Sequence, residues 1–301
     1  MPIESYDSSK NICHSFLQSR EWEQFNQAIG CNTWRVDGVL AIKVEARRGV
    51  FLHIPHISSF SSELCAKLIK LAEKEHCGFI RVSPLMSDLP ENRDIFSSLC
   101  FRKAPLYIHP ESAWILEIDR DEEDLLSEMR KTTRYSIRKA QNDGVKTHIS
   151  GKSEDIERFW KLYEITAKRQ DFVSYSKKFI ETEFKSFGDN IFWVLNEYAA
   201  AVIVLNENEG FYHHGASTHH PTASYAVQWE AIKELRRRGR KWYNFWGVWN
   251  DPKSPQAGLS NFKRGFGGFE ESYVKTQDLP LSAKYWINYI VESARKKQRG
   301  F

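Results

Sequence analysis

The sequence predicts a mixed α/β protein built from two similar units. The chain has 301 residues, 41% of them hydrophobic, which is enough for two domains that each bury a core. Strand-like and helix-like stretches alternate along the chain, with local hairpins, in the order typical of α/β folds. The first hundred residues show a shorter version of the order found in the remainder. We therefore expect two related units.

The first unit is expected to form a small sheet with helices. Asp37 and Gly38 are typical of a tight hairpin turn, and Gly78 is a helix-ending residue followed by an apolar strand. The elements expected in order are a helix from residue 16 to Gly30, strands over 33–37, 39–46 and 50–54, a helix over 61–76, a strand over 79–82, a short helix over 94–99 and a strand over 101–108.

The second unit is expected to repeat this pattern with more helices. An acidic run at 119–124 is typical of a helix start, because the helix dipole favours negative charge there. The elements expected in order are a strand over 114–118, a basic helix closing at 142–144, a strand over 145–149, a helix starting at Ser153, a helix over 179–187, strands over 191–195, 199–205 and 210–216, a helix over 224–238, and strands over 242–248 and 269–274.

The C-terminal tail completes the predicted domain organisation. Residues 281–297 place aromatic and aliphatic side chains on one helical face, so this helix must pack on another element, and we expect it to dock on the first unit. The predicted domains are residues 1–112 with 275–301, and residues 113–274, the second carrying the active site.

Composition and charge exclude several classes of protein. A formal net charge of +4 and a pI near 8.6 are too weakly basic for a dedicated duplex-DNA binder but allow a basic face for phosphates. No stretch has the length of a signal peptide or a membrane span, so we expect a cytoplasmic protein. The cysteines show no metal-ligand spacing and are interpreted as reduced core residues; they are Cys13, Cys31, Cys65, Cys77 and Cys100.

Lys263 is the main catalytic candidate. It lies just before the glycine-rich residues 265–268, in a segment whose pattern is neither a clean helix nor a clean strand. A buried lysine is costly unless it meets an anion, and such a cation can stabilise the oxyanion formed during acyl transfer. A surface lysine beside a turn is the other interpretation of the same residues.

Two histidine pairs lie close to the same region. A histidine near neutral pKa can move a proton, and we consider base catalysis only for His213 or His214. No cysteine or carboxylate stands nearby at a metal-ligand spacing, so we expect no metal. His219 and His220 are interpreted as ordinary packing or surface residues.

Two features suggest anion binding, and each has an ordinary explanation. Residues 217–224 precede a helix whose free N–H groups can hold a phosphate, although every helix has such an end. A basic run at a helix C-terminus suggests an RNA-facing rim, although solvated capping residues explain it equally well. The run consists of Arg236, Arg237, Arg238, Arg240 and Lys241.

Common catalytic motifs are missing from the chain. There is no G-x-S-x-G, no P-loop and no dinucleotide-binding G-x-G-x-x-G. If the protein is an enzyme, its nucleophile comes from a substrate.

The chain resembles the FemABX-type peptidyltransferases, which add amino acids from aminoacyl-tRNA to the peptide of peptidoglycan precursors. The resemblance rests on FLQSREWEQF near the start, KTTRYSIRKAQNDGV in the middle, and YAVQWEAIKEL through FKRGFGG. It implies two acetyltransferase-like (GNAT) units, with the C-terminal helix returning to the first. It also matches Phe262 and Lys263 to the family's Phe-Lys pair, whose lysine assists acyl transfer.

From the resemblance, we expect the site to combine two catalytic and ten binding residues. His214, which stands where relatives have a pocket tyrosine, joins Lys263 as catalytic. The expected substrate-binding residues are Arg134, Tyr135, Arg169, Tyr175, Tyr212, His213, Ser217, Gln228, Trp246 and Phe262.

Three functions remain open at the level of sequence. The first is an aminoacyltransferase in which a peptide amine attacks the ester of aminoacyl-tRNA. The second is a GNAT-like enzyme using acyl-CoA, for which the usual glycine-rich turn before the Tyr225 helix is poorly formed. The third is a catalytically silent module that binds precursor or RNA. For the first, we expect no bound cofactor, a monomer, a UDP-linked or lipid-linked acceptor, and transient contact with a membrane surface.

Overall fold

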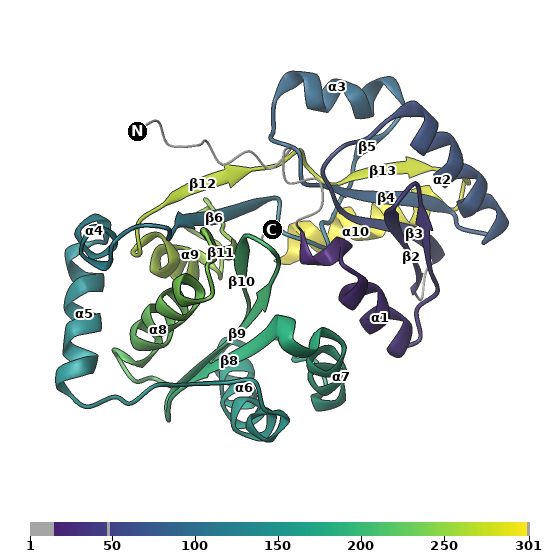
Figure 1. Cartoon of the computed structure of the whole chain (residues 1–301). Coiled ribbons are helices and arrows are strands. Elements are labelled where there is room, and N and C mark those ends of the chain that lie inside the picture. The colour runs from purple at the N-terminus through teal and green to yellow at the C-terminus, as the bar shows by residue number, and fades with distance from the viewer. Residues whose placement is uncertain (1–14, 47–48, 300–301) are drawn as a thin grey trace. The chain divides into compact units, whose positions relative to one another are not determined.

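The structure is a computed structural model that describes residues 15–46 and 49–299. Contacts within the chain divide it into two compact units. The first comprises residues 1–112, 249–255 and 271–301, and the second comprises residues 113–248 and 256–270. Each unit contains one mixed sheet with helices, which confirms the predicted α/β class (Figure 1).

The first unit is a six-stranded sheet in the order β1-β2-β3-β4-β13-β5. Only β3 and β4 pair in parallel, and the other neighbours are antiparallel. Its elements are a 3-10 turn at Phe16–Gln18, α1 (Arg20–Ala28), β1 (Thr33–Val36), β2 (Val39–Ala46), β3 (Gly49–Ile57), α2 (Ser62–Lys74), β4 (Phe79–Pro84), α3 (Pro90–Ser98), β5 (Arg102–Lys103), β13 (Gln277–Pro280) and α10 (Tyr285–Arg299).

Strand alternation sends side chains of the first sheet to two different partners. Leu52 and Ile80 belong to the core that includes Leu68 of α2. Phe51 and Phe79, one residue earlier in each strand, pack instead against Tyr285 of α10. The C-terminal helix thus covers the face of this sheet opposite α2.

A buried charge network joins β4, β13 and α10. Arg81 and Asp278 are directly paired across the two strands, and Arg81 Nε and Nη2 donate to the two oxygens of Asp278 at 2.8 Å. Arg81 Nη2 also donates to Glu292 at 2.7 Å, and the hydroxyl of Tyr285 donates to Asp278 at 3.1 Å. Because the Asp278 side chain is fully buried, this bidentate pair is what satisfies its charge.

The second unit is a seven-stranded sheet in the order β12-β6-β11-β10-β9-β8-β7. Its elements are β6 (Ser112–Glu117), α4 (Glu122–Glu128), α5 (Lys131–Asn142), β7 (His148–Ser150), a 3-10 turn at Ser153–Asp155, α6 (Ile156–Gln170), α7 (Lys177–Phe187), a 3-10 turn at Gly188–Asn190, β8 (Ile191–Leu195), β9 (Ala199–Leu205), β10 (Glu209–Ser217), α8 (Ala223–Arg237), β11 (Trp242–Gly247), α9 (Ala257–Arg264) and β12 (Phe269–Ser272).

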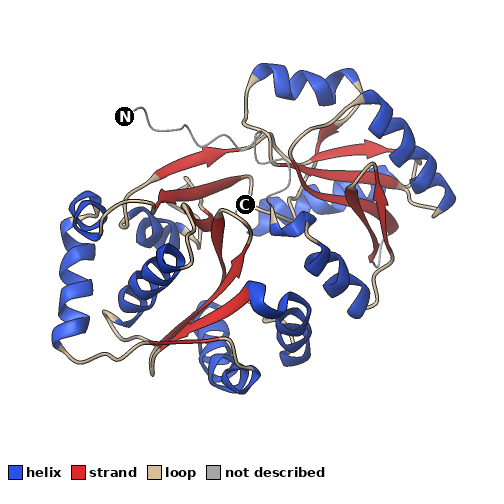
Figure 2. Cartoon of the chain, viewed as in Figure 1, coloured by secondary structure: helices blue, strands red, loops and turns tan. Residues whose placement is uncertain are grey.

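Helices cover both faces of the second sheet (Figure 2). Ala201 and Ile203 of β9 belong to a core that includes Ile232 of α8. On the other face, Trp193 of β8 packs against Phe159 of α6 and Phe184 of α7, with ring centroids 5.1 and 5.0 Å apart. The sheet is therefore buried on both faces, which accounts for the nearly continuous apolar runs of β8 and β9.

Four local features of the structure differ from the sequence predictions. The expected basic helix is divided into α4 and α5, because the chain is extended at Met129 and Arg130. At this break, Arg134 Nη1 donates to carbonyls at the end of α4, including that of Ser127 at 2.9 Å. The segment around Lys263 is the helix α9, and residues 277–280 form an unpredicted strand. The expected strand over 101–108 is reduced to Arg102–Lys103.

The cysteine prediction is correct only in part. Cys65 and Cys77 are buried, Cys31 is partly exposed and Cys100 is exposed, so Cys100 is not a core residue. Cys13 lies outside the described residues.

We expect Arg81→Met to destabilise the first unit by about 3–5 kcal/mol, because the carboxylate of Asp278 would remain buried without its partner. Hydrogen exchange of peptides from β4 and β13, followed by mass spectrometry, measures this unit separately from the second. The control is Arg93→Met, which removes an exposed arginine paired with Asp88 and should leave exchange unchanged. Equal protection in the two variants would contradict the structural role of Arg81.

Candidate active site

The candidate site lies where the parallel strands β10 and β11 stop pairing. Their register runs from Glu209 opposite Trp242 to Phe211 opposite Asn244, and ends there. Beyond this point β10 continues along β9 and β11 continues along β6, each with an irregularity in its register. The two strands therefore diverge inside the sheet.

The irregularity in β11 is held by its own side chains. Trp246 has a φ of +66°, a left-handed conformation that is strained for a bulky residue. The buried side chain of Asn244 accepts a hydrogen bond from the backbone N–H of Trp246 at 2.9 Å, which closes the bulge. Such strain is typical of functional sites, and here it immediately precedes Gly247.

Lys263 reaches this bulge from α9. Its side chain is 3% exposed, and Nζ donates to the carbonyl oxygen of Gly247 at 2.5 Å. Burial lowers the pKa of Lys263 from its ordinary 10.5 to about 7, because the charged form loses its hydration. An amine with a pKa near 7 therefore lies at the point where β10 and β11 diverge.

Tyr212 lies beside Lys263, with the lysine Nζ 6.0 Å from the centre of its ring. Burial raises the pKa of Tyr212 to about 12, which keeps the phenol neutral. Its hydroxyl occupies the space where a Cβ at Gly215 would lie, only 1.8 Å from that position. Gly215 is therefore needed for the present position of the tyrosine ring.

The bulge in β10 gathers His213 and His214 around Glu183 of α7. Nε2 of His213 lies 2.9 Å from one carboxylate oxygen, and Nε2 of His214 lies 2.8 Å from the other. Burial opposes ionisation of Glu183, but the two imidazoles outweigh it and hold its pKa below the ordinary range. Burial lowers the pKa of His213, an effect that His214 increases and Glu183 opposes.

Glu183 shows that the prediction of no metal-ligating carboxylate near the histidines was wrong. Glu183 is 30 residues from His213 in sequence and reaches it only because α7 packs beside β10. The one signal available in the sequence was that Glu183 shares a helical face with Ile180, Phe184 and Phe187, where a glutamate is unusual. The spacing of ligands along the chain did not reveal it.

Several predicted binding residues lie around these groups. The Arg169 guanidinium donates through Nη2 to the hydroxyl of Ser217 at 3.0 Å. Tyr175 stacks on Phe179 at 4.2 Å between ring centroids and meets His214 edge-on at 5.9 Å. Trp246 likewise meets His213 edge-on at 6.0 Å, so an aromatic rim surrounds the histidines.

Four other predicted binding residues do not join this group. Arg134 caps α4, and Tyr135 is exposed on α5. Gln228 is buried and accepts a hydrogen bond from the Tyr243 hydroxyl at 2.5 Å. Phe262, which precedes Lys263 in α9, packs edge-on against Tyr225 at 5.0 Å between ring centroids.

The basic run and the start of α8 are largely occupied by contacts within the protein. Arg237 and Arg238 both donate to Glu234, while Arg236 donates to Glu122 and Arg240 donates to the carbonyl of Glu207. At the start of α8, His220 Nδ1 accepts hydrogen bonds from the N–H groups of residues 222 and 223. His220 thus has the ordinary structural role expected for it.

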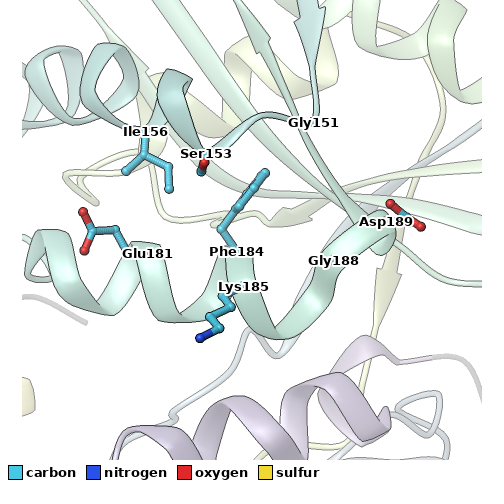
Figure 3. Close-up of a pocket in the computed structure, with 8 residues that line it drawn as sticks. All are labelled: Gly151, Ser153, Ile156, Glu181, Phe184, Lys185, Gly188 and Asp189. Atoms are coloured by element: carbon cyan, nitrogen blue, oxygen red, sulfur yellow. The ribbon is translucent and has the colours of Figure 1, made fainter.

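A surface pocket of about 570 Å³ lies elsewhere in the second unit (Figure 3). It is formed by α6, α7 and the turns beside them, with Phe184 and Ile156 as its apolar part and Glu181 and Lys185 among its charged residues. None of the predicted catalytic or binding residues lines it. We do not place the chemistry there.

Comparison with known families identifies the chain. The FemAB family matches residues 105–198 and 194–293, which is more than half of the sequence and includes Lys263, Tyr212 and both histidines. The chain belongs to the FemAB family. It is accordingly an aminoacyl or peptidyl transferase related to peptidoglycan metabolism, as the resemblance predicted.

Solved structures show the same tandem fold in other proteins. FemX has a TM-score of 0.80 at 16% identity, over 95% of this chain and 96% of its own. L-PGS from Bacillus licheniformis has a TM-score of 0.60 at 10% identity, over 88% of each chain. The C-terminal domain of a putative lysylphosphatidylglycerol synthetase from Agrobacterium fabrum has 0.60 at 10%, over 93% of this chain and 97% of that one. At these identities the likeness concerns the fold.

No curated protein matches the chain. Among the described residues, no helix combines the length and the apolar character that crossing a membrane requires.

We expect Lys263→Met to stabilise the FemAB protein below about pH 7. The folded lysine has a pKa near 7 and the unfolded lysine 10.5, so below pH 7 folding must bury the charge, at a cost of up to about 4–5 kcal/mol. Between the two pKa values the unfolded state binds the extra proton, and the wild-type protein gains stability as pH rises. The advantage of Lys263→Met should therefore shrink from about pH 6 to about pH 10 in urea unfolding. A pH-independent difference would contradict the lowered pKa.

Proposed function

We propose that this protein transfers an amino acid from aminoacyl-tRNA to an amine in the peptide of a peptidoglycan precursor. The observation that carries the proposal is Lys263, a buried amine held against the Gly247 carbonyl where β10 and β11 diverge. It lies inside the region matched by the FemAB family. A cation at such a point suits a reaction whose transition state gains negative charge.

The proposed step is an aminolysis of the ester that joins the amino acid to tRNA. The acceptor amine attacks the carbonyl carbon and forms the C–N bond, and the carbonyl oxygen becomes an oxyanion that the Lys263 ammonium stabilises. The ester C–O bond then breaks, and the ribose oxygen of tRNA leaves with the proton released by the amine. No covalent intermediate on the enzyme is required, consistent with the missing nucleophile motifs.

Arg169, Ser217 and Tyr175 form the proposed acceptor side of the site. Arg169 Nε is buried and makes no hydrogen bond to any described residue, although the same guanidinium donates to Ser217. A peptide carboxylate would satisfy this donor, because carboxylates match the geometry of a guanidinium. Tyr175 is half exposed and offers an aromatic face to the peptide chain.

The start of α8 favours aminoacyl-tRNA over acyl-CoA as the donor. An acyl-CoA pyrophosphate needs free N–H groups at the start of a helix. Here the N–H groups of Thr222 and Ala223 are directed at the His220 imidazole, and the preceding turn contains Pro221 in place of a glycine-rich loop. The structure therefore offers a poor pyrophosphate site at this helix.

The donor and acceptor are tested directly by product mass. The protein is incubated with a mixture of charged tRNAs or with acyl-CoA, and with UDP-linked precursor, lipid-linked precursor or phosphatidylglycerol. We expect one amino acid residue to be added to a peptidoglycan precursor only when charged tRNA is present. Product from acyl-CoA alone would overturn the donor assignment, and product only on phosphatidylglycerol would overturn the acceptor assignment.

Lys263→Met should lower kcat by about 100-fold to 1,000-fold while leaving the KM for the precursor nearly unchanged, since the oxyanion exists only in the transition state. The matched control is Lys233→Met, which removes a lysine of α8 paired with Glu230 on the surface. Because only the charged lysine stabilises an oxyanion, the wild-type advantage over Lys263→Met should fall as pH rises through about 7. An advantage that grows with pH would instead indicate that the neutral lysine acts as a base.

A further inference from the structure

We propose that Glu183, His213 and His214 bind one zinc ion. Each residue offers one ligand atom, and these atoms lie within 4.8 Å of one another. Glu183 and His214 are buried, and His213 is partly buried, so the three groups meet inside the second unit. The proposal concerns metal binding and does not depend on the reaction proposed above.

The backbone of β10 is built in a way that serves this cluster. In a regular strand, consecutive side chains point to opposite faces of the sheet, so His213 and His214 would separate. The register of β10 against β9 shifts between Tyr212 and His214, and both imidazoles meet Glu183 as a result. Bulges often redirect side chains beside functional sites, and this one gathers two nitrogen ligands on one side.

The buried carboxylate of Glu183 favours the binding of a cation. Glu183 is fully buried, and among the described residues its side chain contacts the two imidazoles but no lysine or arginine. A buried carboxylate is costly unless it is paired with a positive charge or coordinates a metal. By contrast, the buried carboxylate of Asp278 in the first unit receives both arms of Arg81. Without a metal, Glu183 depends on a proton held by one of the imidazoles, whereas a divalent ion would supply a permanent positive charge.

The ligand types favour zinc among the common metals. Two imidazole nitrogens and one carboxylate oxygen form a known three-residue zinc set, whereas magnesium and calcium prefer oxygen ligands. Ligand atoms about 2.1 Å from one ion lie roughly 3–4 Å apart. The present distances of 2.8 and 2.9 Å from Glu183 to the imidazoles would lengthen by up to about 1 Å when zinc binds. Zinc would then tie α7 to β10 and keep one further coordination position.

The test measures zinc binding by the full chain, produced without a polyhistidine tag and freed of metal with a chelator. Calorimetric titration with zinc and metal analysis after dialysis should both give one equivalent for the wild-type protein. Glu183→Gln should lower zinc affinity by at least about 10-fold, because loss of a ligand must cost no less than loss of a supporting hydrogen bond. The matched controls are Glu181→Gln, on the exposed side of α7, and His219→Ala, an exposed histidine beyond β10. Both should retain one equivalent.

Two further measurements require no transferase activity, and the first also requires no variant. Zinc should raise the melting temperature of the metal-free wild-type protein, and the chelator should reverse this change. Cobalt in place of zinc should give visible absorption bands that Glu183→Gln lacks and that Glu181→Gln keeps. If the wild-type protein binds no more zinc than Glu183→Gln, the three residues form a hydrogen-bonded cluster without a metal and the proposal is wrong. If the wild-type protein binds zinc but shows no transferase activity, only the reaction proposed above is contradicted.

Discussion

The end of pairing between the parallel strands β10 and β11 is the constraint on which the rest of the second unit depends. After Phe211 and Asn244 the two strands no longer share hydrogen bonds, and each is held by its outer neighbour. Backbone groups at such a point must find other partners. The side chain of Asn244 satisfies the N–H of Trp246, and Lys263 donates to the Gly247 carbonyl. Asn244 and Lys263 thus supply the hydrogen-bond partners that these backbone groups need.

The two units bury positive charge in different ways. Arg81 in the first unit meets two carboxylates and remains a permanent cation, which ties α10 to the sheet. Lys263 in the second unit donates to a neutral carbonyl, and burial brings its pKa near 7. A charge already neutralised by a carboxylate would stabilise an oxyanion poorly. The less favourable environment of Lys263 is therefore the one suited to acyl transfer, at a cost in stability.

Much of the fold was predictable because it depends on local patterns. Helical periodicity and a serine cap identified α2, and continuous apolar runs identified β8 and β9. The strand β13 was not predictable, because its four residues pair with a strand nearly 200 positions earlier. Lys263 was predicted as a site residue from its position before the glycine-rich residues 265–268. The same glycines obscured the helical pattern of α9. Glu183 was missed because only the packing of α7 on β10 brings it to the histidines.

The bulge in β10 couples the position of Tyr212, which lies near Lys263, to the positions of His213 and His214. Tyr212, just before the register shift, belongs with the α8 face and lies near Lys263, whereas His213 and His214 are directed at α7 on the other face. In this register the Tyr212 hydroxyl occupies the space where a Cβ at Gly215 would lie. A shift of the β10 backbone that moves the histidines away from Glu183 would therefore also move the tyrosine beside the lysine. Substitutions at the two faces should consequently be non-additive, as expected for residues coupled through a shared backbone.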